Sequence, residues 1–189
     1  MSIIPREMFV PAPLSSRAYE DSALPIDNRQ TISQPFTVAF MTSMLNVTPG
    51  ANILEIGTGS GYQAAVLAQM GANVTSIERH PILSQKARTV LASLGYAVQC
   101  RVGDGTIGYS AGGPYDGIIV TAGAPDVPEP LAKQLAIGGC LVVPVGSKDQ
   151  QTLYRVVRTA QDLWKAEDLG PFKFVPLIGR SGWEEVHGQ

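Results

Sequence analysis

Short apolar runs and amphipathic helical segments alternate through the middle of the chain. Residues 51–56 form an apolar run that ends in glycines, and residues 81–94 place Leu83, Ala87 and Leu91 on one face of a helix. The same pattern predicts strands at 51–56, 72–77, 96–102, 115–121 and 139–145, and helices at 62–70, 81–94 and 128–136. Strands that alternate with helices require a parallel sheet covered on both faces. The pattern therefore predicts an α/β fold with a doubly wound, mostly parallel sheet.

The C-terminal part of the chain departs from this alternation. Residues 151–159 and 172–178 have the composition of strands, and no convincing helix separates them. Consecutive strands without a crossover helix pair antiparallel. We therefore expect an antiparallel pair that closes one edge of the sheet.

The N-terminal residues 1–34 are rich in proline, serine and aspartate and show little periodicity. They predict an irregular arm that forms part of the substrate cleft, within a single domain over 1–189. A helix is expected to follow at 35–46, with Ser33 as its N-cap and Pro35 in its first turn.

The composition excludes several classes of protein. Hydrophobic residues make up 44% of the 189 residues and charged residues 16%, which is typical of a globular domain. A net charge of -2 without a lysine or arginine block argues against nucleic acid as a partner. No apolar stretch approaches the roughly 20 residues that span a bilayer, and no signal-peptide pattern opens the sequence. We expect a cytoplasmic protein that binds neither nucleic acid nor membrane.

The most informative stretch is Ile53-Leu54-Glu55-Ile56-Gly57-Thr58-Gly59-Ser60-Gly61-Tyr62, in which a buried strand runs through three alternate glycines into a helix. Glycines there let a ligand approach the backbone closely at the carboxyl end of the strand. Dinucleotide sites use a similar loop, but Tyr62 stands where their fingerprint has its third glycine. The loop contains an acid and no lysine or arginine, which suits a sulfonium cation better than a pyrophosphate. A tight turn without a ligand is the alternative.

Two acidic residues follow neighbouring strands at the same edge of the predicted sheet. Glu78 ends the second strand, where a carboxylate accepts hydrogen bonds from a ribose diol; its alternative role is to interact favourably with the dipole of the following helix. Asp104, between Gly103 and Gly105, is placed to meet an adenine amino group, or it forms a plain turn.

Segments along nearly the whole chain resemble one family, the protein-L-isoaspartate O-methyltransferases, in the family's order. The most specific are Gln30-Thr31-Ile32-Ser33-Gln34-Pro35 and Phe174-Val175-Pro176-Leu177-Ile178-Gly179. The other matching segments are Ile4-Pro5-Arg6-Glu7-Met8-Phe9-Val10-Pro11, Ala18-Tyr19-Glu20-Asp21, Leu24-Pro25-Ile26, Leu54-Glu55-Ile56-Gly57-Thr58-Gly59-Ser60-Gly61-Tyr62-Gln63, Ser76-Ile77-Glu78-Arg79, Gly103-Asp104-Gly105 and Ile118-Ile119-Val120-Thr121-Ala122.

The resemblance implies a seven-stranded methyltransferase sheet with an antiparallel strand at its C-terminal edge. It implies S-adenosyl-L-methionine as methyl donor and S-adenosyl-L-homocysteine as product. The acceptor would be the free α-carboxylate of L-isoaspartyl residues in damaged peptides and proteins, and the ester would lead to succinimide formation and repair. By the same resemblance we expect a monomer.

The resemblance also implies roles for single residues. Ser33 matches the family's active-site serine, Glu78 its ribose ligand, and Asp104 with Gly105 its adenine-side contacts. Val175, Pro176 and Leu177 match the segment along the substrate backbone, with Ile32 as a further substrate contact. The remaining expected cofactor contacts are Thr31, Glu55, Gly57, Thr58, Gly59, Ser60, Gly61 and Arg79.

The chemistry of an isoaspartyl acceptor agrees with these residues. Its α-carboxyl group has a pKa of roughly 3.5 and is ionised at pH 7, so attack on a sulfonium methyl needs alignment and no general base. The two histidines, His80 and His187, are expected to be solvated bystanders, and no metal-binding cluster is present. Ser33 would hold the carboxylate by a hydrogen bond instead of acting as a nucleophile.

One departure from the family pattern lies just ahead of Ser33. The family usually continues Leu24-Pro25-Ile26 with a stretch of the form Gly-x-Gly, whereas this chain has Asp27-Asn28-Arg29. Neutral loop drift is one explanation. The other is that Arg29 pairs with an acidic substrate group, in a specialised relative that methylates an aspartate of one dedicated peptide. A small-molecule methyltransferase, a catalytically silent cofactor-binding protein and a nicotinamide dehydrogenase are further alternatives.

Overall fold

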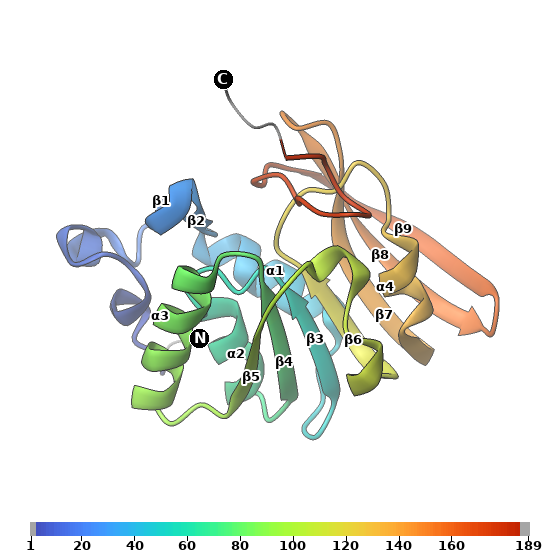
Figure 1. Ribbon diagram of the computed structural model, residues 1–189, viewed down its shortest axis with the longest axis horizontal. Helices are drawn as coiled ribbons and strands as arrows, with labels where there is room; N and C mark the ends of the chain where they lie inside the picture. The colour runs from blue at the N-terminus through green and yellow to red at the C-terminus, as the bar shows by residue number, and fades with distance from the viewer. Residues whose placement is uncertain (1–2, 186–189) are drawn as a thin grey trace.

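The computed structural model describes residues 3–185, so His187 lies outside the described residues. A single seven-stranded sheet dominates it (Figure 1). Its strands are β3 (Asn52–Ile56), β4 (Asn73–Glu78), β5 (Val98–Val102), β6 (Tyr115–Val120), β7 (Leu135–Gly146), β8 (Gln151–Ala160) and β9 (Leu163–Phe172). Their order is β5-β4-β3-β6-β7-β8-β9, parallel through β7, with β8 antiparallel to both of its neighbours. The predicted α/β sheet with an antiparallel C-terminal edge is confirmed.

Helices cover both faces because side chains alternate along each buried strand. The helices are α1 (Pro35–Leu45), α2 (Tyr62–Gln69), α3 (Pro81–Ser93) and α4 (Glu129–Lys133). Ile53 of β3 belongs to a buried cluster with residues of α1 and α2, to which α3 contributes Leu91. The next residue, Leu54, belongs to a second cluster with Leu131 of α4. Both faces of the central strands are therefore buried, which explains their continuous apolar runs.

The N-terminal arm consists of short pieces, as the lack of periodicity predicts. It contains the 3-10 turns η1 (Arg6–Phe9), η2 (Ala12–Arg17) and η3 (Asp27–Arg29) and a two-stranded ribbon of β1 (Leu24–Pro25) and β2 (Thr31–Ile32). In Figure 1 the arm, in blue, lies at the α3 end of the molecule.

The prediction that Ser33 caps the following helix is wrong. The N-cap position of α1 is Gln34, whose side chain makes no capping hydrogen bond. The backbone N–H of Phe36 donates instead to Asp21 Oδ1 at 2.9 Å. An aspartate of the arm therefore supplies the cap, and the Ser33 hydroxyl is left available for another role.

The predicted position of the second antiparallel strand is also wrong. The partner of β8 is β9, at Leu163–Phe172, whereas the rest of the segment predicted as a strand at 172–178 lies outside the sheet. Pro176 of this segment forms only an isolated bridge, with Gly123.

None of the helices within residues 3–185 combines the length and the apolar character that a membrane crossing requires.

Candidate functional site

A cavity of about 340 Å³ opens at the carboxyl ends of β3, β4 and β6. Three parts of the chain that are distant in sequence form its walls: the glycine loop with the end of β4, the arm at 28–33, and the segment at 175–178. The position agrees with the rule that ligands of open α/β sheets bind beyond the carboxyl ends of the strands. Its volume is sufficient for a small ligand.

The glycine loop presents bare backbone to this cavity. Gly57 and Gly59 have φ values of 94° and 53°, in the left-handed region where a Cβ is unfavourable. The loop is held on two sides: Thr121 Oγ1 donates to the Gly57 carbonyl at 2.7 Å, and the Gly59 N–H donates to Glu78 Oε2 at 2.9 Å. Thr58 and Ser60 also line the cavity, whereas Gly61, the N-cap residue of α2, lies outside the lining.

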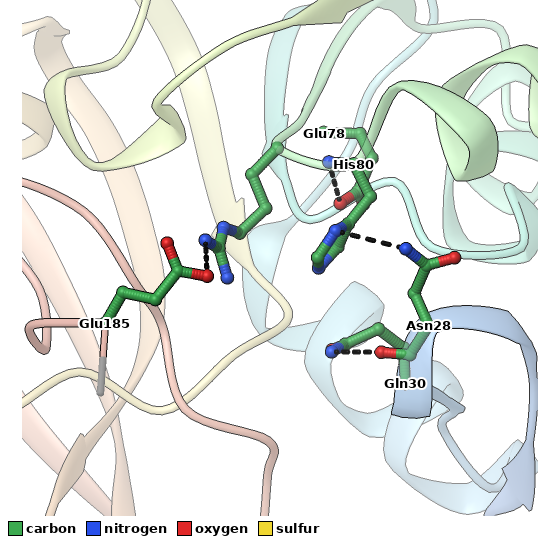
Figure 2. A network of polar contacts seen from close by, with 6 residues as sticks. Asn28, Gln30, Glu78, His80 and Glu185 are labelled. Atoms are coloured by element: carbon green, nitrogen blue, oxygen red, sulfur yellow. Dashed lines mark hydrogen bonds and ion pairs between the residues drawn. The ribbon is translucent and has the colours of Figure 1, made fainter. Parts of the chain in front are cut away.

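Glu78 is buried, yet it belongs to the lining of the cavity. Besides the bond from Gly59, its Oε1 accepts the backbone N–H of His80 at 3.0 Å. Figure 2 shows His80 next to Glu78 and turned toward Asn28 of the arm, whose Nδ2 lies 3.4 Å from His80 Nδ1. The arm therefore reaches across the cavity to the start of α3.

Glu55 does not reach the cavity. Its side chain is 0% exposed behind the loop, where Ser76 Oγ donates to its Oε2 and also lies 2.5 Å from Thr58 Oγ1. Burial raises the pKa of Glu55 to about 8; the hydrogen bond from Ser76 opposes the shift and the nearby charge of Glu78 adds to it. The structure therefore places Glu55 beneath the loop, as a support for Thr58, and not among the lining residues that the sequence predicted.

Asp104 also lies outside the lining, although the adjacent Gly105 is part of it. Its Oδ1 accepts the backbone N–H and the hydroxyl of Thr106, at 2.9 and 2.6 Å, and its Oδ2 accepts the N–H of Arg180 at 2.9 Å. Burial alone would raise the pKa of Asp104, but these donors outweigh burial and leave it lowered. The carboxylate thus ties the C-terminal segment to the turn after β5.

The arm brings four of the predicted residues to the opposite wall: Arg29, Thr31, Ile32 and Ser33. Among residues 3–185, no hydrogen-bond partner is present for the Ser33 hydroxyl, while its carbonyl accepts Arg6 Nη2 at 2.7 Å. Arg29 has a φ of 57°, a conformation that costs a residue with a side chain roughly 1 kcal/mol or more. Within the described part of the chain its guanidinium forms no ion pair, and the nearby Asp27 pairs with Lys86, at 2.6 Å.

The third wall comes from the segment that contains Val175, Pro176 and Leu177, all of which line the cavity. Gly123 N–H donates to the Val175 carbonyl and Leu177 N–H donates to the Gly123 carbonyl, both at 2.8 Å. Within residues 3–185 the carbonyl of Pro176 accepts no hydrogen bond. The segment therefore has one edge fixed to the protein and one carbonyl available.

Arg79 lines the cavity beside Glu78, and its Nη2 forms an ion pair of 2.6 Å with Glu185 Oε1. Figure 2 shows Glu185 extending from the C-terminal segment toward this guanidinium. Since the carboxylate of Glu185 neutralises the charge of Arg79, the glycine-loop side of the cavity carries no excess positive charge that would attract a phosphate group.

In the described part of the chain no cluster of three histidine, cysteine or acidic side chains could hold a metal ion.

Sequence reasoning missed several residues of the site. Thr121 directly follows the buried strand at 115–120, so the rule about carboxyl ends of parallel strands could have identified it. His80 was expected to be a solvated bystander, but it lines the cavity. The contact between Arg6 and the Ser33 carbonyl spans 27 positions and has no periodic signal.

Comparisons of the sequence with known proteins agree with this geometry. A family model described as protein-L-isoaspartate(D-aspartate) O-methyltransferase (PCMT) matches residues 1–182. The chain is 51% identical over 186 residues to the protein-L-isoaspartate O-methyltransferase of Syntrophotalea carbinolica, covering 98% of this chain and 86% of the relative. It is 53% identical over 185 residues to that of Salinibacter ruber, covering 93% of this chain and 80% of the relative.

Solved structures give the same picture for the fold. A protein-L-isoaspartate O-methyltransferase superposes with a TM-score of 0.85 at 30% identity, covering 95% of this chain and 60% of that one. A beta-aspartate methyltransferase from Plasmodium falciparum, in complex with S-adenosyl-L-homocysteine, gives a TM-score of 0.80 at 23% identity, with 92% of this chain and 85% of that one covered.

Proposed function

The chain belongs to the protein-L-isoaspartate O-methyltransferase family, and from this premise we propose how its cavity binds donor and acceptor. The enzyme transfers a methyl group from S-adenosyl-L-methionine to the free α-carboxylate of L-isoaspartyl residues in damaged peptides and proteins. The ester leads to succinimide formation and repair. The relatives named above favour this general activity over one dedicated peptide. One observation carries the assignment of residues: the glycine loop, Glu78 and Ser33 line a single cavity.

The donor side of the cavity has the chemistry that a nucleoside with a sulfonium group requires. The backbone at Gly57 and Gly59 lies open to the ligand, and the carboxylate of Glu78 keeps unused lone pairs beside its two backbone hydrogen bonds. We assign these lone pairs to the ribose hydroxyls, and Thr31, Thr58, Ser60, Arg79 and Gly105 to further contacts with the donor. When bound, S-adenosyl-L-methionine supplies an electrophilic methyl group on a cationic sulfur.

The acceptor side needs a hydrogen-bond donor and no base. The isoaspartyl α-carboxylate is already ionised at neutral pH. The Ser33 hydroxyl lines the cavity without a partner in the described residues, and its assigned role is to donate a hydrogen bond that holds one carboxylate oxygen. Alignment by a fixed donor of this kind is sufficient for a displacement whose nucleophile needs no activation.

The substrate backbone is assigned to the segment at 175–177. Gly123 already binds one edge of this segment, so the Pro176 carbonyl on the other edge is available to accept a backbone N–H of the peptide. Ile32 and Arg29 complete this wall from the arm. Peptide recognition by added backbone pairing tolerates many sequences, as repair of damage at unpredictable sites demands.

The remaining assignments rest on composition and resemblance. We place the activity in the cytoplasm, in a monomer that forms a single domain over residues 1–189 and binds no nucleic acid. The net charge of -2 supports the absence of nucleic-acid binding. The sheet, the arm and the C-terminal segment all contribute to one cavity, which supports a single domain.

The decisive experiment compares paired peptides that differ only in an aspartyl or isoaspartyl linkage. The protein and S-adenosyl-L-methionine should add one methyl group to the isoaspartyl peptide alone, as read by mass spectrometry, and mild base should release the methyl as methanol. Methylation of both peptides alike, or a methyl group stable to base, would contradict the assignment.

A further inference from the structure

Arg6 is an arginine of the arm that is only 1% exposed. Its Nε donates to the Ala18 carbonyl and its Nη2 to the Ser33 carbonyl, both at 2.7 Å. Within residues 3–185 no carboxylate lies within ion-pair distance of its guanidinium. Burial lowers the pKa of Arg6, against smaller opposing effects from Tyr62 and Asp21. Burying a charge without a carboxylate is costly, so the position of this side chain calls for a specific reason.

The same guanidinium also contacts the donor side of the site. Its Cζ lies 4.6 Å from the centre of the Tyr62 ring, and the ring meets Phe9 edge-on with a centroid distance of 5.4 Å. Tyr62 lines the cavity and is the first residue of α2, directly after the glycine loop. One buried side chain thus contacts both the residue that holds the acceptor and the helix that follows the donor loop.

We propose that Arg6 is a positioning residue that sets the distance between the glycine loop and Ser33. Its planar guanidinium binds the Ser33 carbonyl through Nη2 and the Ala18 carbonyl through Nε, and it lies over the ring of Tyr62. A reaction that depends on alignment is sensitive to displacements of about 1 Å, so the rate of transfer depends on this contact even though Arg6 does not line the cavity. The inference rests on the role proposed for Ser33.

A double-mutant cycle tests the coupling. Arg6→Met should lower kcat roughly 10- to 100-fold, which is the size expected for a misplacement of about 1 Å, and should leave the dissociation constant of S-adenosyl-L-homocysteine nearly unchanged. In the Ser33→Ala background the same substitution should have little further effect, because two residues that act as one unit are not additive. Arg6→Lys keeps the charge without the planar guanidinium and should restore part of kcat; it replaces Arg6→Met in the cycle if that variant does not fold.

Arg158 provides a matched control at the far end of the sheet. Its Nη1 donates to the carbonyls of Lys133 and Leu135, at 3.0 and 2.7 Å, and its Cζ lies 5.7 Å from the Trp164 ring centre. Arg158→Met should lower the melting temperature and leave kcat unchanged.

Two outcomes would overturn the inference and leave the role of Ser33 intact. In the first, the fold-losses of kcat in the two single variants multiply in the double variant. In the second, Arg158→Met loses as much kcat as Arg6→Met. If Ser33→Ala by itself leaves both kcat and kcat/KM intact, the role proposed for Ser33 fails, and the inference fails with it.

Discussion

One carboxylate oxygen of Glu78 accepts the backbone N–H of Gly59 across 2.9 Å. The other accepts the N–H of His80, so the side chain joins the glycine loop to the start of α3. Because Glu78 also lines the cavity, one residue both fixes the shape of the loop and borders the space assigned to the donor. The observed contact with the start of α3 and the ribose contact proposed above are therefore compatible in one residue.

Replacing Glu78 by glutamine should weaken donor binding. An amide NH₂ would face one of the two backbone N–H groups, and the charge that strengthens both bonds is lost. Since hydrogen bonds to a charged group contribute about 1.5–3 kcal/mol, the affinity should fall roughly 10- to 100-fold. Calorimetric titration with S-adenosyl-L-homocysteine measures this, with Glu129→Gln on α4 as control, because among residues 3–185 Glu129 pairs only with Lys133, at the surface. Equal affinity in Glu78→Gln and the parent protein would exclude the ribose role.

Replacing Ser33 by alanine should separate binding from turnover. The donor side stays intact, so donor affinity should change little, while loss of a hydrogen bond to a carboxylate should lower kcat/KM about 10- to 100-fold. Steady-state rates with an isoaspartyl peptide provide the measurement. Ser43→Ala is the matched control on α1, since within the described residues the Ser43 hydroxyl donates only to the Phe40 carbonyl of its own helix. Turnover as fast as that of the control variant would rule out the role of Ser33.

Arg29 should bias the enzyme toward acidic peptides. Its guanidinium lines the acceptor wall without an ion-pair partner in the described residues, so a glutamate next to the isoaspartyl residue can pair with it. At an exposed site this contributes up to about 1 kcal/mol, so Arg29→Ala should raise KM roughly 2- to 5-fold for a glutamate-flanked peptide and leave a glutamine-flanked peptide unaffected. Added salt should reduce the difference. Lys165→Ala, an exposed position on β9, serves as control; an equal change in KM for both peptides would contradict the prediction.

Glu55 should make the stability of the protein depend on pH. The native state keeps the Glu55 proton up to about pH 8, whereas the unfolded chain loses it near the ordinary glutamate pKa of 4.5. Between these values the native state binds more protons, so the free energy of unfolding falls as pH rises, by up to about 1.4 kcal/mol per pH unit. Urea titrations from pH 5 to 8 should show this decline in the parent protein and not in Glu55→Gln, which carries no titrating proton. Parallel curves for the two proteins would show that Glu55 is ionised in the fold.

The central sheet could be predicted from the sequence because its strands are buried on both faces and separated by strong signals. The run at 51–56 ends in Gly57, and α3 begins at Pro81 and stops before Gly95, close to the predicted bounds. Such local patterns survive in the fold because tertiary contacts reinforce them.

The incorrect predictions concern segments whose structure is decided by contacts with residues distant in sequence. β9 includes Gly170 and Pro171 and is mostly exposed, so it lacks apolar alternation; an edge strand tolerates both residues. The apolar residues at 174–177 imitate a strand because they pack against the cavity and Gly123. The burial of Glu55 and the use of Asp104 by Arg180 depend on which side chain fills which space, and a local pattern does not encode this.

The cavity takes its acceptor wall from both ends of the chain, from residues 29–33 and from 175–177. As the polypeptide leaves the ribosome, the donor loop and Glu78 emerge long before Pro176. A truncated product that stops after Phe172 would contain all seven strands, the glycine loop, Glu78 and Ser33, yet it would lack the wall at 175–177. Such a product is therefore expected to keep the residues assigned to the donor and to lose the Pro176 carbonyl assigned to the peptide backbone.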